Sequence, residues 1–315
     1  NDGFSNIGPE GKGESVWLGF FLYEILKEFI LIAEYRNDSE TEEQYKQIAE
    51  QLRTNLNTNA WDGRWFKRAF ADNGDVYGSM ENEECRIDSI AQSWSVISGA
   101  GDEEKQKQAM ESLENHLIDI ESGIIKLLDP PFEKGNLEPG YIKAYVPGVR
   151  ENGGQYTHSA IWAIIAEAIL GKGDKAVELY KMITPIEHAR TKEATNKYKV
   201  EPYVISADVY GAQNLAGSGG WTWYTGSSSW YYLAGVQYIL GLNIYHNTMS
   251  FKPCIPKFWK SFGIKYKFGN SIFNISVKNS EAKNTGVSKI IVDGVESENK
   301  IILDGSGKVF NVEVI

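Results

Sequence analysis

The sequence predicts a mainly helical chain that forms a portion of an α/α barrel over residues 1–243, followed by a small antiparallel β domain over residues 244–315. Apolar residues recur at helical spacing through most of the first part, and the spacing changes to strict alternation after Asn243. The predicted helices also come in pairs, joined in turn by short turns and by long polar loops. Paired antiparallel helices build α/α solenoids or closed toroids, and the lack of a visible short repeat favours the toroid.

The first helix pair is predicted over residues 14–35 and 39–56. The first of these segments is rich in apolar residues, and the second is amphipathic with one polar side. Between residues 61 and 79 the pattern changes to short aromatic pieces interrupted by Asp62-Gly63 and Asn73-Gly74. Dipeptides of this kind favour tight turns, so we expect small hairpins there.

The rest of the first part continues the paired pattern around one long interruption. Residues 123–154 contain four prolines and are predicted to be mostly loop, and loops of that length in compact domains are commonly functional. Helices are predicted over residues 87–98, 103–117, 156–170, 174–184 and 227–240, with a short one near residues 205–210. The total is about eight helices, whereas a closed barrel of six hairpins needs about twelve. We therefore expect the other half of the barrel to precede Asn1.

The second part shows the period-two alternation of β-strands, with turns rich in Asn, Asp and Gly between the segments. The predicted strands are residues 262–268, 272–277, 289–292, 300–303 and 309–315.

Composition excludes several classes of protein. The formal net charge of −10 argues against a general nucleic-acid binder, because a phosphate backbone demands a basic face. The four histidines are scattered and the two cysteines lie far apart, so neither a metal site nor a disulfide framework is expected. No signal peptide or membrane-spanning run is visible. A reducing compartment, the cytoplasm of a bacterium, is the natural expectation.

Aromatic residues are unusually frequent, with nine tryptophans and seventeen tyrosines. Aromatic faces stack on the C–H faces of sugar rings while their polar tips form hydrogen bonds. Core packing accounts for most of them, and the excess favours a carbohydrate ligand.

Three stretches carry residues suited to chemistry: Asn1-Asp2-Gly3, Pro147–His158 and Gly219–Trp230. The first places a carboxylate on a loop, although the same residues also make a plain turn. The second gathers charged and polar residues beside Gly153-Gly154 and ahead of a buried helix, where free backbone N–H groups suit an anion. The third holds a Thr-Gly-Ser run at a helix start, whose hydroxyls and backbone N–H groups suit a phosphate, although an N-cap is the simpler interpretation of Thr225 itself.

Taken together, these stretches resemble glycoside hydrolase family 94, the inverting β-glucoside phosphorylases built on an (α/α)6 barrel. The resemblance rests on Asn-Asp-Gly followed by residues 11–19, on residues 147–158, 200–203 and 221–230, and on Lys252–Pro256 ahead of the strands. It covers essentially the whole chain. Within the family, the segments look closest to the phosphorylase-like region of cyclic β-1,2-glucan synthases and to β-1,2-oligoglucan phosphorylases.

The resemblance implies roles for individual residues. The general acid of the family is the second aspartate of an Asp-Trp-Asn-Asp-Gly motif, which falls on Asp2, with the Asp-Trp absent here. Phosphate is held by a histidine in a Tyr-x-His position, here His158, and by a Thr-Gly pair, here Thr225 and Gly226. An arginine from the upstream half completes the phosphate site in the family.

Two further residues match positions that contact the sugar, namely Arg150 and Glu151, although the position of Arg150 holds lysine in some members. The donor-sugar residues of the upstream half are likewise absent from this chain. Activity is therefore expected to need that half, in cis or as a separate chain.

The implied reaction agrees with these residue types. An inverting mechanism needs one carboxylic acid to protonate the glycosidic oxygen while a nucleophile attacks the opposite face of the sugar. Phosphate arrives already anionic and needs donors rather than a base. No metal or organic cofactor is expected, with inorganic phosphate as co-substrate, an oligosaccharide as substrate and a homodimer as the expected assembly.

Three functions remain open from the sequence. The first is phosphorolysis of β-linked gluco-oligosaccharides to α-glucose 1-phosphate, together with the reverse synthesis. The second is a hydrolase of the same fold, with Glu151 or Glu201 as the base that activates water. The third is a non-catalytic carbohydrate-binding part of a cyclic β-1,2-glucan synthase. Dependence on phosphate separates the first two, and turnover with the upstream half supplied separates both from the third.

Overall fold

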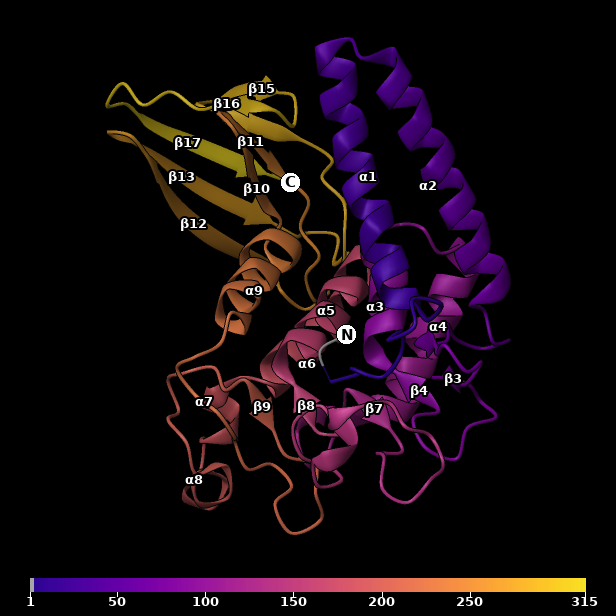
Figure 1. The fold of residues 1–315 in the computed structure, drawn as a ribbon. Coiled ribbons are helices and arrows are strands. Elements are labelled where there is room, and N and C mark those ends of the chain that lie inside the picture. Colours follow the sequence, from indigo (N-terminus) through magenta and orange to yellow (C-terminus); the bar gives the residue numbers. More distant parts are fainter. Residues whose placement is uncertain (1–2) are drawn as a thin grey trace. The chain divides into compact units, whose positions relative to one another are not determined.

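The computed structural model describes residues 3–315, which fold into two compact units (Figure 1). The first unit contains the residues up to Ala166 together with Met182–Ser228, and the second contains Glu167–Lys181 and Ser229–Ile315. The change from helices to strands along the chain occurs at Leu242, while a division into domains at residue 243 stays a prediction.

The helices follow the predicted order with ends shifted by a few residues. They are α1 (Val16–Arg36), α2 (Ser39–Asn59), α3 (Ser89–Ile97), α4 (Glu103–Leu117), α5 (Thr157–Ile169), α6 (Gly173–Met182), α7 (Pro185–His188), α8 (Lys192–Tyr198) and α9 (Ser227–Leu233), with a 3₁₀ turn at Tyr141–Ala144 and a π-helical stretch at Ala234–Ile239. The short helix predicted near residues 205–210 is wrong, because this segment holds the strand β9 (Asp208–Val209). Helices α7 and α8 were not predicted from the sequence.

Side-chain caps fix where the first two helices begin. The Ser15 hydroxyl accepts a hydrogen bond from the Leu18 amide at 3.4 Å, and the Asp38 carboxylate accepts one from the Thr41 amide at 3.1 Å. Between the helices, Asn37 adopts a left-handed conformation with φ of 55° and ends α1. These are the residue types that helix termini favour, which is why the sequence located them well.

Helices α1 and α2 pack side by side as an antiparallel pair (Figure 1). Their close approach depends on Gly19, since a Cβ at that position would lie 2.9 Å from Leu56 Cδ2. Another side of α1 is apolar and exposed. This α1 stripe consists of five exposed residues one helical turn apart: Leu18, Leu22, Ile25, Phe29 and Ile32.

Two carboxylates anchor the long loops of the first unit. The Glu84 carboxylate accepts hydrogen bonds from three successive backbone N–H groups, at residues 133–135, at 2.7–3.0 Å. Burial raises the pKa of Glu84, but these three donors outweigh it, and its pKa lies below the ordinary value. Asp72 holds the Gly-rich turn ahead of α1 in the same way, through the amides of residues 10, 12 and 13.

The strands of the first unit are short and serve to place the loops. They are β1 (Glu14–Ser15), β2 (Ala69–Phe70) and β3 (Val76–Tyr77) in one sheet, β4 (Ile87–Asp88) paired with β7 (Leu128–Asp129), β5 (Ile118–Asp119) paired with β6 (Ile124–Ile125), and β8 (Gln155–Tyr156) paired with β9. The hairpin predicted at Asn73-Gly74 is confirmed by β2 and β3. The β8–β9 pair joins the start of α5 to a segment about 50 residues later, because Tyr156 lies opposite Asp208.

The second unit contains two sheets. One has the order β10–β11–β16, formed by Leu242–Tyr245, Thr248–Phe251 and Ile301–Ile302. The other has the order β12–β13–β17–β14–β15, formed by Ser261–Phe268, Ser271–Lys278, Val309–Val314, Ile290–Val292 and Val295–Ser297. The prediction of a purely antiparallel domain is wrong at one pair, because β13 and β17 run parallel, with Ile272 opposite Val309. Period-two alternation reports which face a residue occupies and carries no information on strand direction.

A helix of the second unit is tied to its loops by one carboxylate. Asp174, at the start of α6, accepts hydrogen bonds from the Lys257 amide at 3.1 Å and from the Asn284 side chain at 2.9 Å. Gly173 permits this contact, since a Cβ there would lie only 2.3 Å from the Ile255 carbonyl oxygen.

Both cysteines are free and buried, Cys85 in the first unit and Cys254 in the second. Among residues 3–315, the helices are each too short or too polar to cross a membrane.

One half-buried histidine makes the stability of the first unit depend on pH. His188, at the end of α7, stacks on Tyr198 with ring centroids 4.9 Å apart. Burial lowers the pKa of His188 to about 4, and Lys197 adds to this effect. In the unfolded chain the His188 imidazole would therefore take up a proton near pH 6.5, whereas in the folded chain it would stay neutral until the pH approaches 4. Its contribution to stability is complete above the unfolded pKa and is lost as the pH falls.

We expect the free energy of unfolding to fall by about 2 kcal/mol from this group alone between pH 7 and pH 5. Chemical denaturation at both pH values, compared between the native chain and His188→Gln, measures it, because the variant should lose that part of the pH dependence. His116→Gln, at an exposed position, is the matched control and should keep it. An unchanged slope in His188→Gln would contradict the assignment.

Candidate functional site

The predicted phosphate histidine lies at the first turn of α5. The strand β8 delivers it there, because the Thr157 amide bonds the Ala207 carbonyl at 2.9 Å and fixes the entry to the helix. The imidazole of His158 stacks on Tyr156, with centroids 5.6 Å apart, and tilts against Trp162, at 6.0 Å. Burial lowers the pKa of His158. The ring is therefore neutral at pH 7 and has one N–H to donate.

A cavity of about 260 Å³ in the first unit opens beside this histidine. Its wall is mainly apolar and aromatic, and five of its lining residues are ionisable. The residues that line it are Gly3, Phe4, Trp17, Arg68, Asp88, Ile90, Leu127, Ile142, Glu151, Tyr156, His158 and Trp162. A concave, largely apolar site with a few convergent polar groups is the usual form of a small-molecule site.

Residues close to the predicted acid reach the same cavity. Gly3 and Phe4 line it, and the Gly3 carbonyl accepts a hydrogen bond from the Ile142 amide at 3.0 Å. The Phe4 ring packs edge-on against Tyr77 and Phe132. Asp2 itself lies outside the described residues.

The predicted Thr-Gly pair comes next to His158 from more than sixty residues away. A Cβ built on Gly226 would lie 3.5 Å from His158 Nε2, so the Gly226 backbone faces the imidazole directly. The Thr225 hydroxyl accepts a hydrogen bond from the Ser227 amide at 3.1 Å and contacts the Ser227 hydroxyl at 2.6 Å. Thr225 therefore also caps the start of α9, as the simpler reading of the sequence predicted.

Arg150 and Glu151 sit side by side at the tip of the long loop. Arg150 has a left-handed backbone with φ of 51°, which is unusual for a residue with a side chain. Its guanidinium lies over the rings of Tyr145 and Trp221, 5.4 and 5.6 Å from their centroids. Glu151, in contrast, lines the cavity together with His158. The loop thus connects the cavity to an aromatic surface.

Sequence reasoning missed a buried aspartate in this region. Asp208 is 1 % exposed, and one of its carboxylate oxygens accepts a hydrogen bond from the Trp221 amide at 3.1 Å. Burial raises its pKa, and the positive charge of Arg150 opposes that rise. Gly220 is required beside it, since a Cβ there would lie 2.5 Å from the carboxylate. The sequence offered no signal beyond an acidic residue in an apolar segment.

An ion pair at the cavity wall was also missed. Arg68 Nε lies 3.3 Å from Asp88 Oδ2, and the two side chains are 3 % and 0 % exposed. The guanidinium also lies over the rings of Phe4 and Trp17, at 4.9 and 5.8 Å. Burial raises the pKa of Asp88, and Arg68 opposes that rise. Arg68 lies next to the β2–β3 hairpin and Asp88 caps α3. These local roles already explain both residues in the sequence, so their pairing was not predicted.

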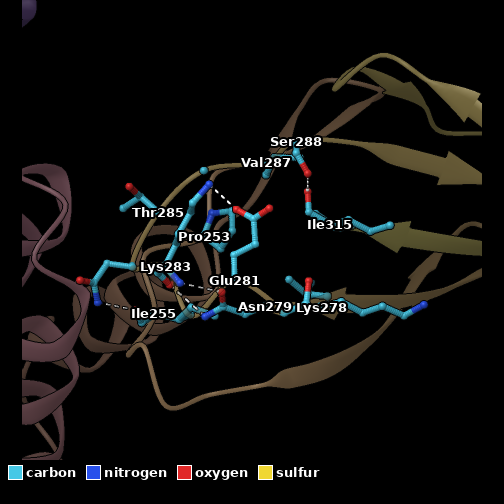
Figure 2. A pocket seen from close by; sticks show the side chains of 15 residues that line it. Pro253, Ile255, Lys278, Asn279, Glu281, Lys283, Thr285, Val287, Ser288 and Ile315 are labelled. Atoms are coloured by element: carbon cyan, nitrogen blue, oxygen red, sulfur yellow. Dashed lines mark hydrogen bonds and ion pairs between the residues drawn. The ribbon is translucent and has the colours of Figure 1, made fainter.

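The second unit has a separate cavity of about 210 Å³, shown in Figure 2. Its polar groups are largely engaged with one another: Asn279 exchanges hydrogen bonds with the Lys283 backbone, Lys283 pairs with Glu281, and the Ser288 hydroxyl bonds the Ile315 carbonyl at 2.8 Å. None of the predicted site residues lies there. Across residues 3–315, no cluster of three or more His, Cys, Asp or Glu is placed to hold a metal ion.

Comparison with known proteins gives a family match. The model of the glycosyl hydrolase 94 superfamily catalytic domain matches residues 1–241. The chain is 44% identical over 277 residues to the cyclic β-(1,2)-glucan synthase NdvB of Rhizobium meliloti, covering 88% of this chain and 10% of that protein. It is 31% identical to the solabiose phosphorylase of Paenibacillus borealis and 30% identical to the N,N′-diacetylchitobiose phosphorylase of Vibrio proteolyticus.

These relatives are much longer than the chain. The alignments cover 100% and 97% of this chain but only 41% and 38% of the two phosphorylases. Among solved structures, a sialidase is similar in fold, with a TM-score of 0.54 at 13% identity over 84% of this chain and 24% of that one.

Proposed function

The chain belongs to the glycosyl hydrolase 94 superfamily, and we propose on that basis that it takes part in the inverting phosphorolysis, and the reverse synthesis, of β-linked gluco-oligosaccharides. The observation that carries the proposal is the meeting of His158 with the Gly226 backbone beside a cavity that Glu151 and Gly3 also line. An anion site and a sugar-sized space therefore share one wall. Phosphorolysis needs both in contact.

The roles follow from the chemistry of each group. The neutral His158 donates one hydrogen bond to phosphate, and the Gly226 backbone leaves room for the anion beside it. Thr225 adds a hydroxyl, while its cap on Ser227 holds it in place. The apolar wall excludes water, so that each hydrogen bond to phosphate is stronger than it would be in solvent. The product would be α-glucose 1-phosphate, with phosphate as co-substrate and no cofactor.

The acid is proposed to be Asp2, two residues before Phe4 in the cavity wall. A carboxylic acid there would protonate the glycosidic oxygen while phosphate attacks from the other face of the ring. Arg150 and Glu151 would contact the sugar. The preference for β-1,2-linked glucans is proposed from the similarity to the glucan synthase.

Completion of the site is proposed to need a preceding segment of the same protein or of a second chain. The longer relatives support this, and so does the α1 stripe, which leaves five apolar side chains without cover. Isolated exposed apolar residues are ordinary, but an aligned run of them marks a surface that packs against something.

The test is the dependence of product release on phosphate. In the protein that includes the preceding segment, we expect glucose 1-phosphate to be released from a β-1,2-gluco-oligosaccharide only when phosphate is present. His158→Gln should lower kcat/KM for phosphate about 10- to 100-fold, because it removes a hydrogen bond to a charged group. His116→Gln, far along the chain in α4 and exposed, is the matched control.

Two other outcomes would identify different functions. Release of free glucose without phosphate would show a hydrolase, with Glu151 in the cavity wall as the base to test. Oligosaccharide binding with no turnover under either condition would show a non-catalytic binding part.

A further inference from the structure

A group of large aromatic side chains is exposed beside the candidate site. This aromatic strip consists of Tyr203, Trp221, Trp223 and Tyr224, which are 76%, 54%, 63% and 84% exposed. All four belong to the first unit and come from two segments that pair at the Ser206–Thr222 bridge. Side chains this large and apolar are usually buried, so their shared exposure calls for a ligand.

The backbone of the strip is strained to hold one of these rings. Trp223 has φ of 71°, in the left-handed region. For a residue with a side chain this conformation costs about 1–2 kcal/mol relative to the ordinary one. No burial offsets that cost, because the ring is mostly in water. Backbone strain that no burial compensates is typical of a residue that contacts a ligand.

The orientation of the same ring is also fixed. The indole N–H of Trp223 donates a hydrogen bond to the Glu201 carboxylate at 3.1 Å. Tyr203 packs edge-on against Trp223, with centroids 6.4 Å apart and planes at 69°. These two contacts favour one orientation of the Trp223 ring over the other rotamers open to a surface tryptophan.

Contacts of Arg150 and Asp208 connect the strip to the candidate site. Trp221 lies under the Arg150 guanidinium, and the residue after Arg150 is Glu151, which lines the cavity. The Trp221 amide is bonded to Asp208, which lies opposite Tyr156 of the same cavity wall. Trp221 is therefore linked to two residues of the cavity wall, to Glu151 through its neighbour Arg150 and to Tyr156 through Asp208.

We propose that the aromatic strip binds glucosyl units of an oligosaccharide beyond those held in the cavity, by stacking of sugar rings on Trp221 and Trp223. This rests on the proposed function and adds to it that the substrate is a chain rather than a disaccharide. A sugar is favoured over a protein surface because the residue between Trp221 and Trp223 is Thr222 and the residue after Tyr224 is Thr225, and both carry hydroxyl groups. Protein interfaces of this size have apolar centres, whereas sugar sites combine aromatic faces with hydroxyl and carboxylate groups.

The strain supplies a clean test, because glycine adopts the conformation of Trp223 without cost. Trp223→Gly removes the ring while relaxing the backbone, so its melting temperature should not fall. We expect kcat/KM for phosphorolysis of a β-1,2-linked hexasaccharide to fall about five- to tenfold, as for loss of one stacked ring. The value for the disaccharide should stay within about twofold, and Trp223→Phe should recover part of the loss. Tyr245→Ala, at an exposed tyrosine of the second unit that matches Tyr203 in exposure at 76%, is the control.

Binding measured by calorimetry with the same hexasaccharide separates this proposal from the proposed function. If the native protein turns over neither substrate with phosphate, the proposed function is wrong. A loss of hexasaccharide affinity in Trp223→Gly, measured by calorimetry, would still show that the aromatic strip binds sugar. Equal losses for both chain lengths, or no loss for either, would overturn the strip as a sugar site. A change of oligomeric state in Trp223→Gly without a change in hexasaccharide affinity would assign it to a protein interface instead.

Discussion

Replacing Asp2 with Asn is expected to lower the rate of phosphate-dependent cleavage of an ordinary glucoside by about 10²–10⁴-fold. The substitution removes a proton donor and changes little volume, so oligosaccharide binding should remain largely intact. The measurement belongs in the protein that includes the preceding segment, with initial rates of glucose 1-phosphate release and binding followed in parallel. We expect the Asp2 carboxyl across the cavity from His158, about 6–10 Å from the phosphate position, as inverting geometry requires.

An aryl glucoside with an acidic leaving group provides the control for this result. Its leaving group needs no proton, so Asp2→Asn should retain much of the native rate on this substrate. Glu201→Gln, at a carboxylate that bonds Trp223 of the aromatic strip and does not line the cavity, should leave cleavage of a disaccharide near the native rate. Native rates from Asp2→Asn on the ordinary glucoside would show that the acid lies elsewhere, and Glu151 would be the next candidate.

The second large effect is on stability. Replacing Arg68 with Met should lower the free energy of unfolding by about 3–5 kcal/mol at pH 7, because it leaves the Asp88 carboxylate buried without its partner. Removing both charges, in Arg68→Met with Asp88→Asn, should recover a large part of that loss. The asparagine side chain can still accept the hydrogen bond that Asp88 takes from the Ile90 amide at the start of α3.

Chemical denaturation of the single and double variants measures the coupling between the two residues. Lys107→Met is the matched control, because it breaks an ion pair with Glu104 whose side chains are 56% and 87% exposed, and it should cost less than about 1 kcal/mol. If Arg68→Met costs no more than Lys107→Met, the buried pair does not stabilise the cavity wall. A double variant as unstable as the single one would show that the packing of Arg68 on Phe4 matters more than its charge.

The long helices were predictable because their signals are local. Ser15 and Asp38 cap α1 and α2, and the apolar residues between follow the helical period. Helices α7 and α8, within residues 185–198, were not predicted, and the helix predicted at residues 205–210 was wrong. Elements of one or two turns contain too few residues for their spacing to distinguish a helix from a strand. The parallel pairing of β13 with β17 depends on contacts between residues about 37 positions apart, which alternation cannot encode.

The residues of the candidate site also divide into those that local motifs predict and those that depend on the assembled fold. His158 and Gly226 were predicted through motifs, and the structure places them together. Arg68, Asp88 and Asp208 were not, because each lies in a segment whose local pattern already has a sufficient explanation. What makes these residues notable is burial beside a cavity, and burial is a property of the assembled fold. The strained backbone of Trp223 likewise has no sequence signature.

The uncovered stripe on α1 has a thermodynamic consequence. A surface that is apolar in the folded state and covered only by another segment makes folding and association a single linked equilibrium. Where the cover is a second chain, the apparent melting temperature should rise with the concentration of that chain, whereas a cover supplied by the same protein would make it independent of concentration.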